Sequence, residues 1–293
     1  MDTQSLLATQ PEFYKQQLIR SLKLYKASLL HVLHFALLLS ITFFIPRLIT
    51  LVVGHNIFLG LSPFSLKRLW IELIAIIGMF FYAALLWRMR CIIFNVHESL
   101  FEDMKVAIKR LFLIIAASII QSLIFSLLCI GIVAFYHYLV PRTLFFQSSL
   151  LELPLVMSGL LFYLIAVVYL YFSFIFYLPL ILAEKKGVFT ALGKSAFLVW
   201  KNWWRTFWLQ ITPWASYLIC LIIIKQIFSG NSHFNFSFGQ PTSLFATVLH
   251  ILIFALFVPW IVAILLVQLR DLELRKNYTM LHGKKRTKNS TRL

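Results

Sequence analysis

Residue types that could carry out chemistry are few in this sequence, and their spacing argues against catalysis. Among the ten acidic residues, Glu102 and Asp103 form the only adjacent pair. Neighbouring residues on a helix project in different directions, so these two carboxyl groups make a poor acid–base couple. The sequence also lacks the HExxH, GxSxG and glycine-rich phosphate-binding motifs of common enzyme classes. We therefore expect no catalytic residue and no enzymatic activity.

The histidines and cysteines do not form a metal-binding pattern. Three histidines fall in three separate expected loops, at His55, His137 and His233. The three cysteines contain no CxxC pair and lie far apart, at Cys91, Cys129 and Cys220. We expect no metal site, no disulfide and no cofactor.

Polar side chains inside apolar runs are a second place where function could lie. The candidates are Glu72, Gln121 and Gln210. Glu72 follows Arg68 by four residues, so an ion pair on one helix face is an alternative to a functional role. No apolar run has a central charged residue, which argues against an ion-coupled carrier. A permease for an apolar or lipid-like solute stays open as an alternative function.

Aromatic and basic residues alternate in the stretch 179–207, where an apolar run gives way to charged residues. The candidate contacts to lipid headgroups are Lys194, Trp200, Lys201, Trp204, Arg205 and Trp208. Tryptophans at four-residue spacing share one helix face, and indole rings favour the headgroup level of a membrane. The stretch is interpreted either as a general membrane anchor or as a specific site for one lipid headgroup.

The elements that carry these residues are transmembrane helices. Hydrophobic residues make up 61% of the 293 residues, charged residues 13%, and the mean hydropathy is +0.87. This composition predicts an all-α polytopic membrane protein with one six-span domain over residues 1–274. The expected spans are 27–46, 69–87, 111–136, 157–182, 206–224 and 245–269. Amphipathic patterns predict three cytoplasmic interfacial helices, at 11–26, 92–109 and 188–204, and a disordered basic tail at 275–293.

The basic residues predict the orientation of these spans. The net charge is +17, and 22 of the 27 Lys and Arg residues fall on the side of the termini. The five on the other side are Arg47, Lys67, Arg68, Arg142 and Lys225. The positive-inside rule therefore places both termini in the cytoplasm. We expect anionic lipids of the cytoplasmic leaflet as partners, with protein partners also open, and no nucleic acid.

Two short segments carry a family resemblance. The first is Pro179-x4-Glu184-x2-Gly187 followed by Ala191-Leu192-x-Lys194-Ser195, and the second is the segment 268–275, QLRDLELR. In these residues and in its six-span layout the chain resembles the YciC-type bacterial inner-membrane proteins and the related membrane domain of glycerophosphoryl diester phosphodiesterases. The resemblance implies a non-catalytic role in the bacterial cytoplasmic membrane, because the phosphodiesterase chemistry of that group belongs to a separate soluble domain.

These observations together predict a non-enzymatic integral membrane protein of the cytoplasmic membrane. Its expected role is in envelope or membrane homeostasis, through contacts with lipids or partner proteins. A permease for an apolar or lipid-like solute is the alternative. A lipid-modifying enzyme is a third hypothesis, which would require Glu72 and the outer histidines to meet in one pocket.

Overall fold

The computed structural model describes residues 6–53, 66–96, 98–139, 149–228 and 244–290. These residues form helices and no strand. The helices are α1 (Tyr14–Val53), α2 (Leu66–Ile93), α3 (Leu100–Leu139), α4 (Ser149–Phe174), α5 (Tyr177–Ala183), α6 (Val188–Trp200), α7 (Trp203–Phe228) and α8 (Leu244–Ser290).

Six helical stretches are long and apolar enough to cross a membrane. They lie in α1, α2, α3, the α4–α5 pair, α7 and α8. A helix satisfies its own backbone hydrogen bonds, which is what a segment without access to water requires. The all-α class and the six predicted spans are confirmed, and the chain is a multi-pass membrane protein.

Helix α8 lies at the centre of the bundle. In its most apolar window 67% of residues are buried, against 11% in that of α3. Helix α8 packs most extensively against α1, and α1 also packs on α2. Small residues without exposed surface, such as Ala36 of α1, Ala84 of α2 and Ala263 of α8, allow these helices to approach closely. Large side chains such as Leu30 and Phe112 stay exposed, as expected for surfaces that face lipid.

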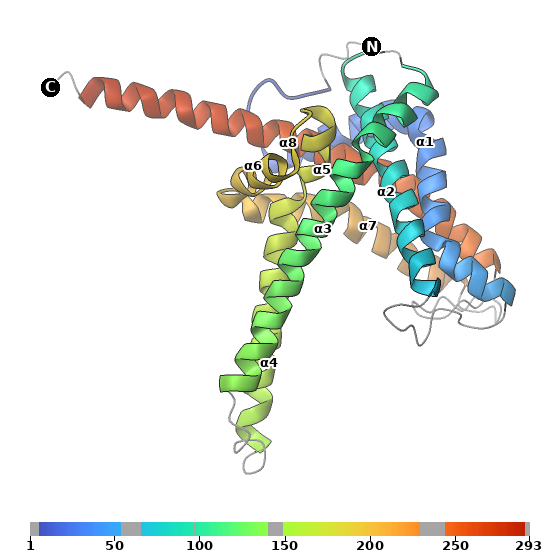
Figure 1. The fold of residues 1–293 in the computed structure, drawn as a ribbon. Coiled ribbons are helices and arrows are strands. Elements are labelled where there is room, and N and C mark those ends of the chain that lie inside the picture. The colour runs from blue at the N-terminus through green and yellow to red at the C-terminus, as the bar shows by residue number, and fades with distance from the viewer. Residues whose placement is uncertain (1–5, 54–65, 97, 140–148, 229–243, 291–293) are drawn as a thin grey trace.

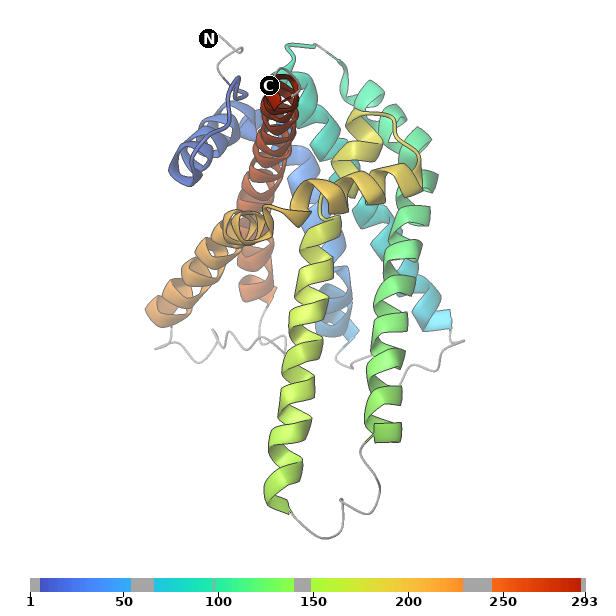
Figure 2. The same ribbon diagram turned by 90° about the vertical axis from the view of Figure 1, so that its left-hand side faces the viewer.

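Both described ends of the chain lie at one end of the molecule (Figures 1 and 2). We call this the terminal end. Helix α6 lies crosswise there, over the end of α4 (Figure 2). Helices α3 and α4 run side by side and extend away from the terminal end, whereas α8 continues out of the bundle towards the C-terminus (Figure 1).

The predicted boundaries of the interfacial helices need correction. Residues 14–26 are not a separate helix, because α1 runs without a break from Tyr14 to Val53. The segment 92–109 is divided between the end of α2 and the start of α3. Of the three predicted segments, only 188–204 contains a separate short helix, α6, which ends at Trp200. Helix extension is cooperative, and the sequence around residues 26 and 110 has no glycine or proline to stop it.

The predicted disordered tail differs from the structure, in which α8 continues to Ser290. The segment 270–276 is rich in Leu, Arg, Glu and Lys, all of which favour helix. Asp271 and Arg275, four residues apart, form an ion pair with a distance of 2.7 Å between Oδ2 and Nε. This pair favours a helix where the predicted tail begins, at residue 275.

Candidate functional site in a cavity between the helices

The predicted fourth span is broken into two helices near the terminal end. Helix α4 ends at Phe174, and α5 begins at Tyr177. Pro179 has no N–H group to donate to the carbonyl four residues earlier, so an unbroken helix would lose a bond here. Ser195 of α6 compensates for the break: its hydroxyl accepts a hydrogen bond from the Phe176 N–H (3.1 Å) and donates one to the Ser173 carbonyl (2.8 Å). After the break, the α5 residues from Leu178 to Leu182 are buried.

A cavity of about 570 Å³ lies beside this break, between α1, α2, α3, α4, α5, α7 and α8. Its wall is largely apolar and includes Leu39, Met79, Leu178, Phe254 and Val258. Phe43 and Tyr171, which also line it, are exposed on the surface of the bundle, so the cavity can be reached from the surrounding lipid. Its size and apolar wall are typical of a site for a small ligand.

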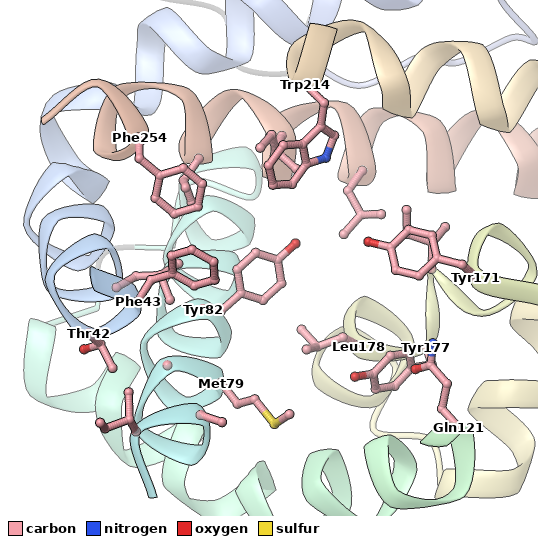
Figure 3. A pocket seen from close by; sticks show the side chains of 18 of the residues that line it. Thr42, Phe43, Met79, Tyr82, Gln121, Tyr171, Tyr177, Leu178, Trp214 and Phe254 are labelled. Carbon is pink, nitrogen blue, oxygen red and sulfur yellow. The ribbon is translucent and has the colours of Figure 1, made fainter. Parts of the chain in front are cut away.

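Three tyrosines are among the polar residues that line the cavity. Tyr82 of α2 and Tyr171 of α4 point their phenol groups towards one another across it, and Tyr177 of α5 lies below them (Figure 3). The Tyr177 hydroxyl is 2.9 Å from the hydroxyl of Ser118. Within the described part of the chain, the hydroxyls of Tyr82 and Tyr171 have no hydrogen-bond partner. Phenol groups in apolar surroundings normally have one, so these two are available to a ligand.

The structure brings together two of the three predicted intramembrane polar residues. Gln121 of α3 and Gln210 of α7 both line the cavity. The Gln210 amide donates to the side-chain oxygen of Gln268 on α8, at 2.8 Å, with both residues buried. Glu72 is exposed on α2 and is not part of the wall. The described lining residues carry no charged side chain, so the cavity suits an uncharged group.

Two of the predicted headgroup contacts are engaged in ion pairs within the protein. The Lys194 ammonium contacts the carboxylates of Glu184 and of Glu273, the latter at 2.8 Å. Arg205 points towards α8 and lies 3.7 Å from the buried carboxylate of Asp271. Both cations therefore have acidic partners within the protein, and their contact with lipid headgroups stays a prediction.

The predicted stripe of three tryptophans is divided between two helices. Trp200 ends α6, whereas Trp204 and Trp208 belong to α7, and the turn at Lys201 and Asn202 lies between them. All three indole rings are exposed, at 69%, 67% and 56%. Exposed indoles at the end of an apolar helix are suited to the membrane interface, so the anchoring interpretation stays a prediction with a corrected geometry.

A cluster of ionic contacts fixes the start of the chain to the terminal end of the bundle. The Glu12 N–H donates to Asp271 at 2.7 Å, and the Glu12 carbonyl accepts from Arg275 at 2.6 Å and from Arg205. The Glu12 side chain pairs with Arg20. Every charge in this cluster has a partner, which is the arrangement that partly buried ions require. The cluster is therefore best explained as structural.

A second cluster at the terminal end contains residue types that can bind a metal ion, but a fixed cation of the protein lies next to them. Ligand atoms of Cys91, Glu98 and Asp103 lie within 4.8 Å of one another. However, the Arg88 guanidinium is 3.3 Å from Asp103, and the Glu98 carboxylate accepts hydrogen bonds from Trp87 (2.8 Å) and from the Cys91 thiol (3.5 Å). A fixed cation already pairs with the Asp103 carboxylate, so the geometry favours an ion-pair cluster.

The sequence reasoning missed the three tyrosines and Ser195. The tyrosines lie in aromatic-rich runs, where they resemble ordinary apolar residues of a span. The available signal was chemical: a phenol in an apolar run needs a hydrogen-bond partner, and no span offers an obvious one. Which of several tyrosines meet in one cavity depends on helix packing.

No protein-family model, curated protein or solved structure matches this chain.

Proposed function

We propose that this chain is a non-enzymatic membrane protein that binds an uncharged, lipid-like molecule between its helices and acts in envelope or membrane homeostasis. The observation that carries the proposal is the apolar cavity with the unpaired phenol groups of Tyr82 and Tyr171. Leaving such groups without a partner in an apolar setting costs free energy, and a ligand with a polar head would remove that cost.

The lining chemistry defines the class of ligand. Phenol groups donate hydrogen bonds to carbonyl and hydroxyl oxygens, and the described wall offers no charge to pair with a phosphate or an amine. Access from the bundle surface suits a molecule that already resides in the membrane. A diacylglycerol, with ester carbonyls, one hydroxyl and apolar chains, has this chemistry.

The setting we propose is the bacterial cytoplasmic membrane, with both termini in the cytoplasm. The asymmetry of Lys and Arg supports this orientation. Anionic lipids of the cytoplasmic leaflet are proposed as partners at the terminal end, where the exposed indoles lie. We also propose membership of the YciC-type group, on the residues in 179–207 and 268–275, in agreement with a role without catalysis.

A binding experiment tests the cavity proposal. The purified full chain in detergent is photolabelled with a diacylglycerol that carries a diazirine on one acyl chain, and the labelled peptides are identified by mass spectrometry. We expect labels on residues of α2, α5 or α7 that line the cavity. Tyr82→Phe with Tyr171→Phe should weaken labelling at least about threefold, because two hydrogen bonds to the ligand are lost.

Tyr163→Phe is the matched control, since it removes a phenol of α4 that is absent from the described cavity wall. Equal labelling of wild type and the double variant would contradict the proposal. So would labels spread evenly over all lipid-facing surfaces.

The second candidate function is a permease for the same class of molecule. Two features favour it: the cavity has polar groups from several helices, and the α4–α5 break places an interrupted helix at its wall. Reconstituted protein should then move a fluorescent diacylglycerol analogue between leaflets faster than empty liposomes do. If the photolabelling experiment shows binding but the analogue does not move between leaflets, the binding function is supported and the permease function is excluded.

A further inference from the structure

A groove of about 960 Å³ lies at the terminal end, separate from the intramembrane cavity. Its walls are the N-terminal segment 9–11, the end of α6 with the following turn, and the segment 272–278 of α8. We call it the terminal groove.

The groove is built by contacts that need no ligand. The segment 9–11 is held next to α8 because the following residue, Glu12, binds Asp271 through its N–H and Arg275 through its carbonyl. The middle of α6 is tied to α8 by Lys194 and Glu273. The walls are therefore fixed before anything binds.

The charges that face the groove are positive. Lys201, Arg275 and Lys276 line it, and no carboxylate does so among the described residues. Arg275 is paired with Asp271, and the ion pairs of Arg205 and Lys194 lie next to the groove. Lys276 lies over the ring of Phe197, with 4.6 Å between Nζ and the ring centroid, which orients its ammonium without neutralising it.

Aromatic side chains place the groove at the depth of lipid headgroups. Trp200 lines it and is 69% exposed, and Trp204 and Trp208 are exposed on the adjacent start of α7. Indole rings prefer the zone between the acyl chains and water. A soluble anion would use the lysines alone, whereas a phospholipid would place its phosphate near the lysines and its glycerol and first methylenes against Trp200.

We propose that the terminal groove binds the headgroup of an anionic phospholipid from the leaflet on the side of the termini, with Lys201 and Lys276 as its phosphate contacts. The site deepens the lipid-contact part of the proposed function and is independent of the cavity. Its ligand is charged, whereas the ligand of the cavity is not.

Native mass spectrometry of the full chain tests this site. Dioleoyl phosphatidylglycerol and dioleoyl phosphatidylcholine are added in parallel, so that only the headgroup differs. We expect wild type to retain more phosphatidylglycerol, and Lys201→Gln and Lys276→Gln each to reduce that preference about fivefold. Lys105→Gln with Lys109→Gln is the matched control, since it removes two exposed lysines of α3 away from the groove.

The proposal is overturned if the groove variants keep the preference, or if the α3 control loses it to the same extent. Displacement of the lipid by soluble glycerol 3-phosphate would also overturn it, because the site would then recognise a soluble anion. Diacylglycerol photolabelling of the cavity should be unchanged in the groove variants. The proposals for the groove and for the cavity are therefore tested separately.

Discussion

At the scale of single residues, Ser195 shows how one hydroxyl permits a break in a membrane span. The break frees backbone groups in a region without water, and Ser195 pairs with one donor, at Phe176, and one acceptor, at Ser173. Unsatisfied backbone groups are costly in such surroundings. Ser195 also belongs to the Lys194-Ser195 motif of the family resemblance, so a residue that carries the resemblance has a structural role here.

Replacing Ser195 with alanine should lower the free energy of unfolding by about 1–3 kcal/mol, because a buried N–H and a buried carbonyl lose their partner. Thermal unfolding of the purified protein in detergent measures the effect. Ser28→Ala is the control: Ser28 is also buried, but it donates to the Leu24 carbonyl inside a regular helix. A loss at Ser195 no larger than that at Ser28 would show that the break does not depend on this hydroxyl.

At the scale of elements, α6 is held in its crosswise position by an ionic contact as well as by packing. Lys194 of α6 joins Glu184, which follows α5, to Glu273 of α8. Burial raises the pKa of Glu184, but hydrogen bonds with Glu273 and Lys194 outweigh burial and hold its pKa below the ordinary value. Burial lowers the pKa of Lys194, and hydrogen bonds with Glu184 and Glu273 outweigh it and raise that pKa.

These shifts predict a loss of stability in acid. A carboxyl group whose pKa is lower in the folded protein stabilises it above the unfolded pKa, and this contribution disappears as the pH falls through the folded pKa. Lys194 stays protonated throughout, since its raised pKa would remove its contribution only in strong alkali. The contact therefore stabilises the protein at neutral pH and weakens as Glu184 takes up a proton.

The comparison of wild type with Lys194→Gln measures this effect. The difference in Tm should be largest near neutral pH and should shrink between about pH 5 and about pH 3, where glutamates titrate. Lys15→Gln removes an exposed lysine of α1 and should leave the Tm unchanged at every pH. Parallel profiles for wild type and Lys194→Gln would contradict a role for the ion pair.

At the scale of the whole molecule, α8 organises the bundle and leads out of it at the terminal end (Figure 1). Polar contacts to α8 come from several parts of the chain: Gln210 binds Gln268, and Glu12 binds Asp271. Both partners on α8 belong to the second segment of the family resemblance. The two ends of the chain are thereby joined on one side of the six spans.

The proposed orientation, with both termini in the cytoplasm, predicts which reporter fusions will be active. Alkaline phosphatase fused after Leu293 should be inactive and green fluorescent protein fused there fluorescent, because both report a cytoplasmic position. Phosphatase fused after Arg142, in an expected outer loop, should be active. The opposite pattern would place both termini on the side away from the cytoplasm, although they would still share one side.

The sequence by itself determined the class and the number of spans. A long apolar run that crosses a bilayer must form a helix, because only a helix satisfies the backbone hydrogen bonds within one segment there. The number of spans therefore follows from the composition and length of the runs. The polar residues in these runs can also be identified from the sequence, and two of them, Gln121 and Gln210, line the cavity. Helix ends were less predictable, because the sequence pattern that suits an interfacial helix also suits the continuation of a span, as in α1.

Only the tertiary structure decided what the side chains do. Arg205 lies next to Trp204 in sequence, yet one binds Asp271 and the other faces outward. Tyr82 and Tyr171 face one another across the cavity although they are 89 positions apart (171 minus 82). The physical reason is that lipid-facing and core-facing apolar residues look alike in a membrane span. Helix rotation, and with it the location of a site, is therefore set by packing between helices and not by hydrophobicity along the chain.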